Sequence, residues 1–164
     1  MPWIDAGWST YLSVQAGVAA TLTGLVFVAV SINLSRILST VGLTGRAAES
    51  LLQLFGVVII STTALVPKQS PAALGTEILF FDLLLWLIQT ISQIRYLANR
   101  EGHPRLWAVS RIIQTQSANV PLCVAGILLL LGWPAGLYWL AAGFAFSLIS
   151  GVVGAWVLLV EILR

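Results

Sequence analysis

The chain has 164 residues, of which 59% are hydrophobic and only 9% are charged, and its mean hydropathy is +0.97. Soluble domains carry about 25% charged residues, so this composition excludes a soluble globular protein, whose surface must face water. The length leaves no room for a separate catalytic or nucleic-acid-binding domain beside a membrane part. With a formal net charge of only +2, we also expect no nucleic-acid partner.

Five apolar stretches are long enough to cross a bilayer, whose hydrocarbon core of about 30 Å requires about 20 helical residues. They cover residues 14–34, 48–66, 74–94, 112–133 and 138–160. Backbone polar groups in lipid must be satisfied within each segment, which favours helices. The sequence therefore predicts an all-α, polytopic membrane helix bundle of five transmembrane helices that forms one domain over residues 1–164.

Turn residues separate these stretches. Pro67 and Pro71 bracket a polar turn in which Ser70 can cap the third helix, with Pro71 at its first position. Residues 133–136 (Trp-Pro-Ala-Gly) predict a tight hairpin between antiparallel neighbours. Thr44 is the expected cap of the second helix.

Basic residues are unevenly distributed among the loops. One side of the predicted bundle has Lys68, whereas the other has seven arginines: Arg36, Arg46, Arg95, Arg100, Arg105, Arg111 and Arg164. Basic loops remain cytoplasmic, so we expect the N-terminus outside and the C-terminus inside. An aromatic interfacial belt is expected on the outer side, from Trp3, Trp8, Tyr11, Trp133, Tyr138 and Trp139.

Several classes of site are missing from the sequence. No phosphate-binding loop, zinc helix or Gly-rich dinucleotide turn is present. With one histidine, one cysteine and one carboxylate deep in a span, a metal or acid–base site cannot be assembled within one subunit. We therefore expect no enzyme, no catalytic residue, no metal and no cofactor, and the lipid bilayer as the main partner.

Small residues recur at helical spacing in the first and fifth stretches. In lipid, such faces let helices approach closely, within one bundle or between subunits. The predicted packing residues are Gly17, Gly24 and Ser31 in the first stretch and Gly143, Ser147 and Gly151 in the fifth.

Asp82 is the one carboxylate near the middle of a span. It lies nine residues after Ala73, about 13 Å along a helix, and Gln89 and Gln93 follow it on the same face. A carboxylate at that depth costs at least about 2.5 kcal/mol, and such residues are by default functional candidates. One face of this helix is therefore a candidate polar pathway.

The partner of Asp82 cannot be a cation of its own subunit. No Lys or Arg lies near mid-span, so we expect no buried salt bridge within a subunit. Asp82 is then neutral and hydrogen-bonded to a neighbouring helix, hydrated, or facing a permeating cation. Glu49, Glu77 and Glu161 lie near helix ends and are expected at the interface.

The fourth stretch adds Ser117, Asn119 and Pro121 near the same depth. Pro121 cannot donate a backbone hydrogen bond and crowds the carbonyl of Ser117, so a helix kink is expected there. The freed carbonyl and Asn119 could form an ion or proton site, and a purely structural kink is the alternative.

Residues 22–34 and 45–49 resemble a group of short, uncharacterised bacterial integral membrane proteins. Some of that group carry the label of modulators of a membrane-bound protease. The resemblance covers the first third of the chain and involves no catalytic motif. It implies a multi-pass protein of the bacterial plasma membrane and assigns no functional residue.

The leading hypothesis is a homo-oligomer that forms a small ion- or proton-conducting pathway along the polar face of Asp82, Gln89 and Gln93. Since one five-helix chain has too few helices for both a path and a lipid-proof wall, we expect subunits to share the path. The alternative is an accessory or regulatory subunit that binds another membrane protein, such as a protease or transporter, through its small-residue faces.

Overall fold

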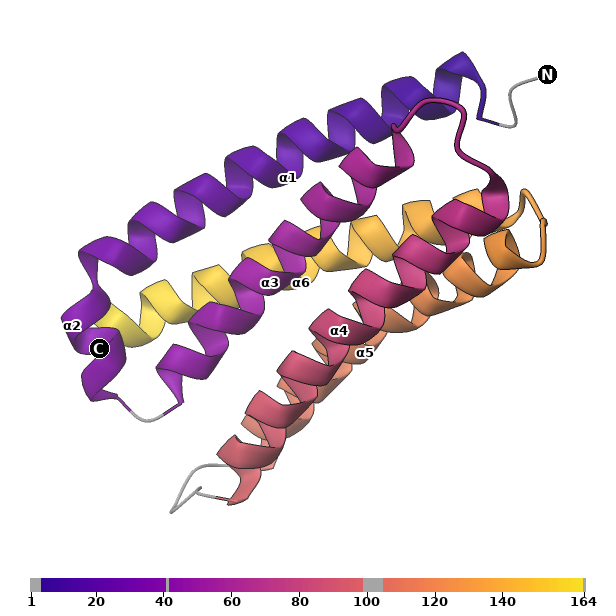
Figure 1. The fold of residues 1–164 in the computed structure, drawn as a ribbon. Coiled ribbons are helices and arrows are strands. Elements are labelled where there is room, and N and C mark those ends of the chain that lie inside the picture. Colours follow the sequence, from indigo (N-terminus) through magenta and orange to yellow (C-terminus); the bar gives the residue numbers. More distant parts are fainter. Residues whose placement is uncertain (1–3, 41, 99–104, 164) are drawn as a thin grey trace.

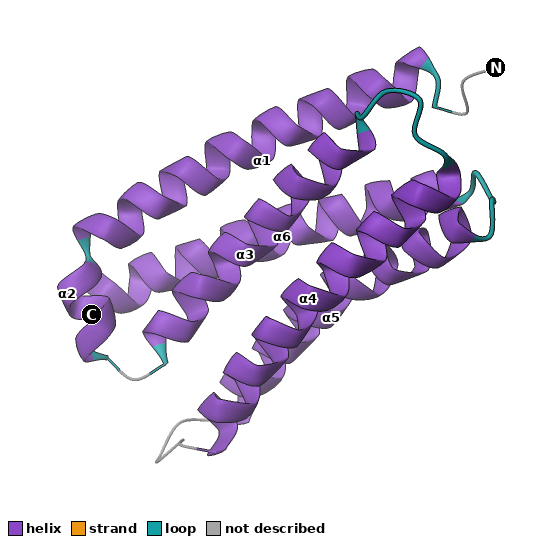
Figure 2. Ribbon diagram, in the orientation of Figure 1, coloured by secondary structure: helices purple, strands orange, loops and turns teal. Residues whose placement is uncertain are grey.

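The chain folds into α-helices, with no strand among residues 4–40, 42–98 and 105–163, which are the residues that this computed structural model describes (Figure 1). Figure 2 shows that short loops join the helices. In chain order the helices are α1 (Ala6–Ile32), α2 (Leu34–Ser39), α3 (Leu43–Ala64), α4 (Pro71–Ala98), α5 (Arg105–Leu130) and α6 (Gly136–Leu163).

Within the described residues, five helices are long and apolar enough to cross a membrane: α1, α3, α4, residues 109–130 of α5 and residues 136–160 of α6. The prediction of an all-α bundle with five spans is confirmed. The helices extend beyond the predicted apolar stretches. For example, α4 begins at Pro71 and ends at Ala98, because helical hydrogen bonding continues after the apolar residues end.

Helices α3, α4, α5 and α6 form a ring in which each packs against the next and α6 packs back against α3. Helix α1 lies outside this ring against α3 and makes few contacts with α6 (Figure 1). The N-terminus, the α3–α4 loop and the α5–α6 loop lie at one end of the bundle, which we call the N-terminal end.

The opposite end, which we call the arginine-rich end, contains Arg36, Arg46, Arg95 and Arg111. Arg100 and Arg164 lie outside the described residues, as does the side chain of Arg105. The sequence predicts that the arginine-rich end is cytoplasmic, and the segregation of the described arginines from Lys68 agrees with the loop assignment behind that prediction.

Two of the three helix termini that the sequence predicts form as predicted. The Ser70 hydroxyl accepts the N–H of Ala73 at 3.1 Å and Pro71 is the first residue of α4, as predicted. Gly132 ends α5 at φ +79° and donates its N–H to the carbonyl of Leu129 at 2.9 Å. This left-handed glycine closes the helix and forms the predicted tight hairpin.

The third terminus differs from the prediction. The chain forms the short helix α2 after α1, and Gly42, at φ +87°, then turns it into α3. Thr44 lies inside α3 and donates its hydroxyl to the carbonyl of Ile37 at 3.2 Å. The prediction that Thr44 caps this helix is therefore wrong, because α3 begins at the residue before Thr44. Ile37, which is 1% exposed, packs α2 against α3.

Aromatic side chains gather at the N-terminal end. The ring of Trp8 lies edge-to-face 5.2 Å from the ring of Tyr138 and 5.7 Å from that of Tyr11. Trp133 and Trp139 are exposed nearby, and Trp3 lies outside the described residues. This grouping agrees with an interfacial belt at one end of the spans.

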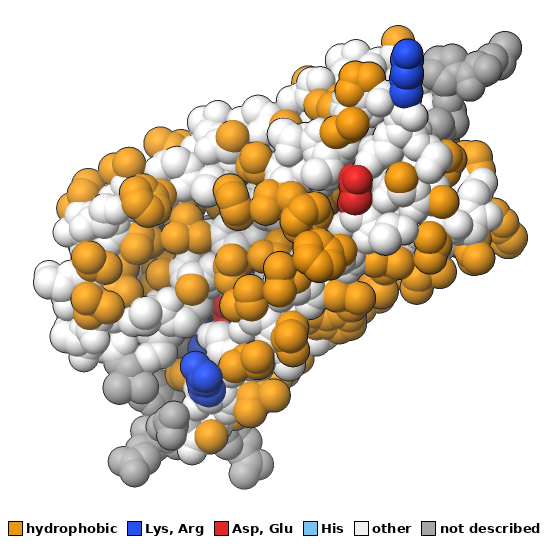
Figure 3. All heavy atoms as spheres, in the orientation of Figure 1, with side chains coloured by type: hydrophobic (Ala, Val, Ile, Leu, Met, Phe, Trp, Pro, Cys, Tyr) orange, Lys and Arg blue, Asp and Glu red, His pale blue; other side chains and the backbone are white. Residues whose placement is uncertain are grey.

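The outer surface of the bundle is largely apolar. Figure 3 shows hydrophobic side chains across the whole face in view, with basic side chains only near its two ends. Large side chains such as Leu25, Phe80 and Trp156 are more than 60% exposed. A surface of this kind requires hydrocarbon as its solvent, which the bilayer supplies.

Candidate functional site

The polar face predicted for α4 points into the ring of α3–α6. Asp82 and Gln89 are each 1% exposed and Gln93 is 6% exposed. These residues recur every seven or four positions and thus lie on one side of the helix. Their neighbours Leu83, Leu87 and Ile94 are exposed, so α4 turns its apolar side to lipid and its polar side inward.

Two hydrogen bonds join this face to neighbouring helices. The amide Nε2 of Gln53 on α3 donates to Oε1 of Gln89 at 2.8 Å. The Nε2 of Gln93 donates to the hydroxyl of Thr115 on α5 at 2.7 Å. Both bonds are buried, and in a medium of low dielectric such bonds fix the register of α4 against α3 and α5.

A buried ion pair lies next to these bonds, toward the arginine-rich end. Arg111 donates to the Glu49 carboxylate twice, from Nε at 3.0 Å and from Nη2 at 2.6 Å. The two side chains are 5% and 10% exposed, and the guanidinium lies 4.7 Å from the ring centroid of Tyr96. This is the bidentate geometry in which arginine binds carboxylates most strongly.

The sequence does not predict this ion pair. It predicts no cation beside Asp82 at mid-span and places Glu49 near a helix end, at the interface. Glu49 is nevertheless 8% exposed, because the long side chain of Arg111 reaches it from α5. Hydropathy places each residue by depth along its own helix, whereas the pairing depends on how α3 and α5 face each other.

Among the described residues, no cation pairs with Asp82. Neither carboxylate oxygen has a hydrogen-bond partner among the described residues. The bond between Gln53 and Gln89 fixes the antiparallel register of α3 and α4, and in that register Asp82 lies at the level of Ser61. Ser61 is fully buried and its hydroxyl likewise lacks a partner in the described part of the chain.

Asn119 and Ser147 are two further buried polar residues, and they lie at a common height in the bundle. A Cβ on Gly143 would meet the side chain of Leu122, which sets the register of α6 against α5. One turn further toward the arginine-rich end, Asn119 of α5 and Ser147 of α6 therefore lie at the same height. They are 2% and 1% exposed, and Nδ2 of Asn119 and the Ser147 hydroxyl are unpaired within the described residues.

The buried polar groups together form an interior polar file. It begins with the Glu49–Arg111 pair at the arginine-rich end, continues through the Gln53–Gln89 bond and Asn119, and ends at Asp82. A cavity of about 20 Å³ lies along its first part, lined by Arg46, Glu49, Ser50, Gln53, Arg111, Gln114, Thr115, Ser150 and Gly154. That volume accommodates one water molecule.

Beyond Asp82 the interior is apolar. Ile78, Leu74, Leu129 and Phe144 are all fully buried within one hydrophobic cluster that fills the half nearer the N-terminal end. The polar file therefore reaches from one end of the bundle to its middle and stops at a packed apolar barrier.

The remaining site candidates, Ser117 and Pro121, lie on α5. The Ser117 hydroxyl, half-buried, donates to the carbonyl of Gln114 in its own helix at 2.9 Å, so it does not reach the file. Pro121 is buried inside α5, which continues through it to Leu130. Cys123 is a half-buried free thiol on the same helix.

The packing glycines of α6 lie inside the bundle, as the small-residue pattern suggested. A Cβ on Gly151 would stand 2.6 Å from side-chain atoms of Leu54 on α3, and one on Gly143 would stand 2.5 Å from Leu122 on α5. Ser147, buried on the same face, completes this group. Helix α6 uses these positions to approach both α3 and α5.

The small residues predicted for packing on α1 make no such contact. A Cβ on Gly17 or Gly24 would meet nothing within 4 Å. Ser31 is exposed and donates to the carbonyl of Phe27 in its own helix at 2.8 Å. This face therefore makes no close contact within the chain at Gly17 or Gly24, because α1 turns its other side to α3. Packing between subunits, the other predicted possibility, stays a prediction.

Comparisons with protein-family models, curated proteins and solved structures found no match for this chain. The described residues include no group of three or more His, Cys, Asp or Glu side chains that could hold a metal ion. The interior polar file is the feature of the described residues that points to a function. Sequence periodicity indicated its α4 members, whereas the parts played by Thr115 and Arg111 follow only from the helix packing.

Proposed function

We propose that this protein is an integral membrane protein that moves protons through the interior of its α3–α6 ring, with Asp82 as the group that takes up and releases the proton. One observation carries the proposal: Asp82 is 1% exposed, near mid-span, with neither carboxylate oxygen hydrogen-bonded among the described residues. A carboxyl group at such a site is costly and is typical of proton relays in membrane proteins.

The interior favours a proton over a larger ion. The cavity beside the file holds about one water molecule, which is too little space for a hydrated metal cation. Proton transfer needs only a carboxyl group, hydroxyl groups and single waters within hydrogen-bond reach of each other. Ser147, whose buried hydroxyl lacks a partner among the described residues, supplies such a group between Asp82 and the cavity level, and Ser61 supplies another at the level of Asp82.

The proposed route connects Asp82 to one end of the bundle, and an apolar barrier separates Asp82 from the other end. Asp82 exchanges protons with the arginine-rich end along the polar file, whereas Ile78, Leu129 and Phe144 separate it from the N-terminal end. Transport across the membrane therefore requires a second conformation in which this apolar half admits water. A rearrangement of packed helices of this kind is a common switching device.

The route runs inside one chain. The sequence favours a pathway shared between subunits of a homo-oligomer. We propose a route within one chain because four helices surround the file, with α1 outside the ring against α3. Self-association is not needed for the proposed route, and a conducting monomer is part of the proposal.

The test is proton flux into liposomes that contain the purified protein and a pH-sensitive dye. A potassium diffusion potential drives uptake, and the wild type should acidify the lumen faster than empty liposomes do. Asp82→Asn keeps the side-chain volume and should lower the flux to the empty-liposome rate. Glu77→Gln is the matched control, since Glu77 lies on the same helix but bonds to Gln69 near the N-terminal end, and it should retain wild-type flux.

Two results would defeat the proposal. One is a wild-type rate equal to that of empty liposomes at both polarities of the potential. The other is an Asp82→Asn rate equal to the wild-type rate, since the carboxyl group would then play no part.

A second candidate, an accessory subunit of another membrane protein, draws support from α1. Its outer face carries Gly17 and Gly24 with open space around both, which suits close approach of a partner helix. The resemblance of residues 22–34 to bacterial membrane proteins favours this reading in a bacterial plasma membrane.

This second candidate predicts that Gly24→Leu abolishes co-purification of a membrane-protein partner from native membranes, while Asp82→Asn leaves it intact. Gly151→Leu is unsuitable for the same purpose, because Gly151 packs against Leu54 inside the bundle. A purified wild-type protein that carries no partner at native expression levels would contradict the accessory role.

A further inference from the structure

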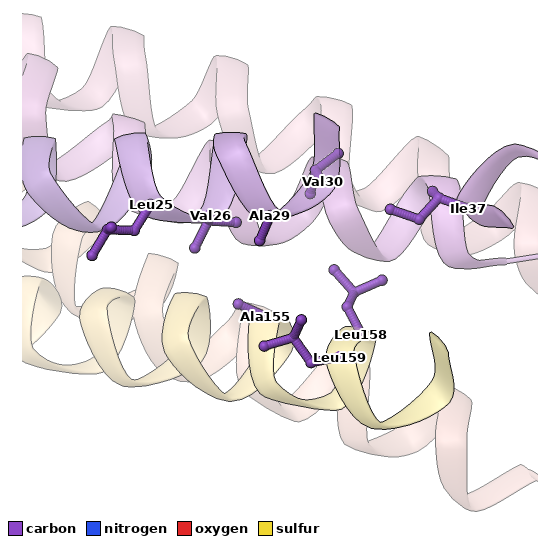
Figure 4. A pocket seen from close by; sticks show the side chains of 8 residues that line it. All are labelled: Leu25, Val26, Ala29, Val30, Ile37, Ala155, Leu158 and Leu159. Atoms are coloured by element: carbon purple, nitrogen blue, oxygen red, sulfur yellow. The ribbon is translucent and has the colours of Figure 1, made fainter. Parts of the chain in front are cut away.

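An apolar crevice separates α1 from α6 in the half of the molecule nearer the arginine-rich end (Figure 4). Its volume is about 160 Å³. Side chains of α1, among them Leu25 and Ala29, face Ala155 and Leu159 of α6 across it. The crevice exists because α1 packs against α3 and makes few contacts with α6.

The crevice is closed toward the arginine-rich end and open at its side. Ile37 of α2 and Leu158 of α6, 1% and 3% exposed, pack together with Leu43 and Ala47 and form its floor. Leu25, by contrast, is 63% exposed at the crevice. The opening thus lies within the apolar length of α1 and faces the hydrocarbon of the bilayer.

We propose that one acyl chain of an anionic phospholipid occupies this crevice. Apolar cavities of about 150 Å³ take up a small hydrocarbon ligand, so a crevice of this volume and apolar lining takes a segment of an acyl chain, with the rest of the chain in the surrounding bilayer. A helix of a second protein is about 10 Å across and cannot enter a space of this volume. A single flexible hydrocarbon chain can enter from the side.

A basic residue on α2 favours an anionic headgroup. Arg36 is exposed and directly precedes Ile37, which forms part of the floor. An acyl chain in the crevice would therefore bring its headgroup to the level of α2. One basic residue at the membrane surface favours an anionic headgroup by about fivefold. This lipid site is independent of the proton route, which lies on the other side of α3.

Native mass spectrometry of the purified protein tests the proposal, with equimolar dioleoylphosphatidylglycerol and dioleoylphosphatidylcholine in the detergent micelle. The wild type should retain one lipid, with phosphatidylglycerol favoured about fivefold. Ala155→Trp fills the crevice and should abolish the retained lipid. Ala145→Trp is the matched control, because Ala145 is an exposed residue of the same helix outside the crevice, and it should retain the lipid.

Two further variants control for misfolding and test the headgroup preference. Ala29→Trp fills the crevice from α1 and replaces Ala155→Trp if that variant fails to fold, as judged by circular dichroism. Arg36→Gln should retain one lipid but lose the preference for phosphatidylglycerol. The proposal is overturned if the wild type retains no lipid, if both crevice-filling variants retain as much as wild type, or if a second protein copy is retained in place of the lipid.

Discussion

The Glu49–Arg111 pair allows the buried polar interior to be tested quantitatively. In Arg111→Met the side chain keeps an unbranched apolar stem but loses the guanidinium, so the Glu49 carboxylate loses both of its donors. Breaking a buried ion pair on one side costs about 3–5 kcal/mol. Because the pair lies toward one end of the bundle, we expect the lower value, about 3 kcal/mol, which corresponds to roughly a hundredfold change in the unfolding equilibrium.

The double variant Glu49→Met with Arg111→Met distinguishes the ion pair from simple packing. Replacement of a buried pair by apolar side chains of similar volume is often neutral or stabilising. We therefore expect the double variant to recover wild-type stability or to exceed it. The free energy of unfolding is measured by titrating the protein from dodecylmaltoside micelles with sodium dodecyl sulfate and following helicity by circular dichroism.

Arg95→Met is the matched control, since Arg95 is exposed in the last turn of α4. It should change the free energy of unfolding by less than about 0.5 kcal/mol. An Arg111→Met variant that is no less stable than this control would contradict the expected cost of breaking the ion pair. A double variant as unstable as the worse single variant would equally contradict it, because the carboxylate would then not be the source of the cost.

Three other predictions concern the packing of the bundle and its orientation in the membrane. Gly75→Ala should destabilise the bundle by about 1–3 kcal/mol in the same titration, because its Cβ would stand 2.5 Å from a backbone nitrogen of α5; Gly17→Ala, with open space around it, should not. Thr115→Val leaves a buried amide without its acceptor and should cost about 1–3 kcal/mol by the same measurement. Finally, in a background without the native cysteine, a membrane-impermeant maleimide applied to intact cells should label Lys68→Cys but not Arg95→Cys; the reverse pattern would contradict the predicted orientation.

The Asp82→Asn variant connects function and stability. The carboxyl group is buried without a hydrogen-bond partner in the described part of the chain, so it is a cost to the fold. If the proton route is correct, loss of flux in this variant should come with unchanged or higher stability, as is common for functional residues. A loss of flux caused by unfolding would appear as lower stability in the detergent titration.

Local sequence patterns predicted the apolar surroundings of the protein, the number of spans and the polar face of α4. Hydrophobic length is a local property, and a 3.6-residue period places Asp82, Gln89 and Gln93 on one side of a helix whatever surrounds it. Local turn chemistry likewise predicted Ser70 as a cap.

Which helices face each other could not be predicted from local patterns. Glu49 and Arg111 are 62 residues apart, and their pairing depends on the register of α3 and α5, which no local pattern encodes. The small-residue faces of α1 and α6 look alike in sequence, yet Gly151 packs against Leu54 while Gly24 meets nothing. In lipid, where apolar faces have no hydrophobic drive to associate, close fit and buried hydrogen bonds select the neighbours, and both are properties of the assembled bundle.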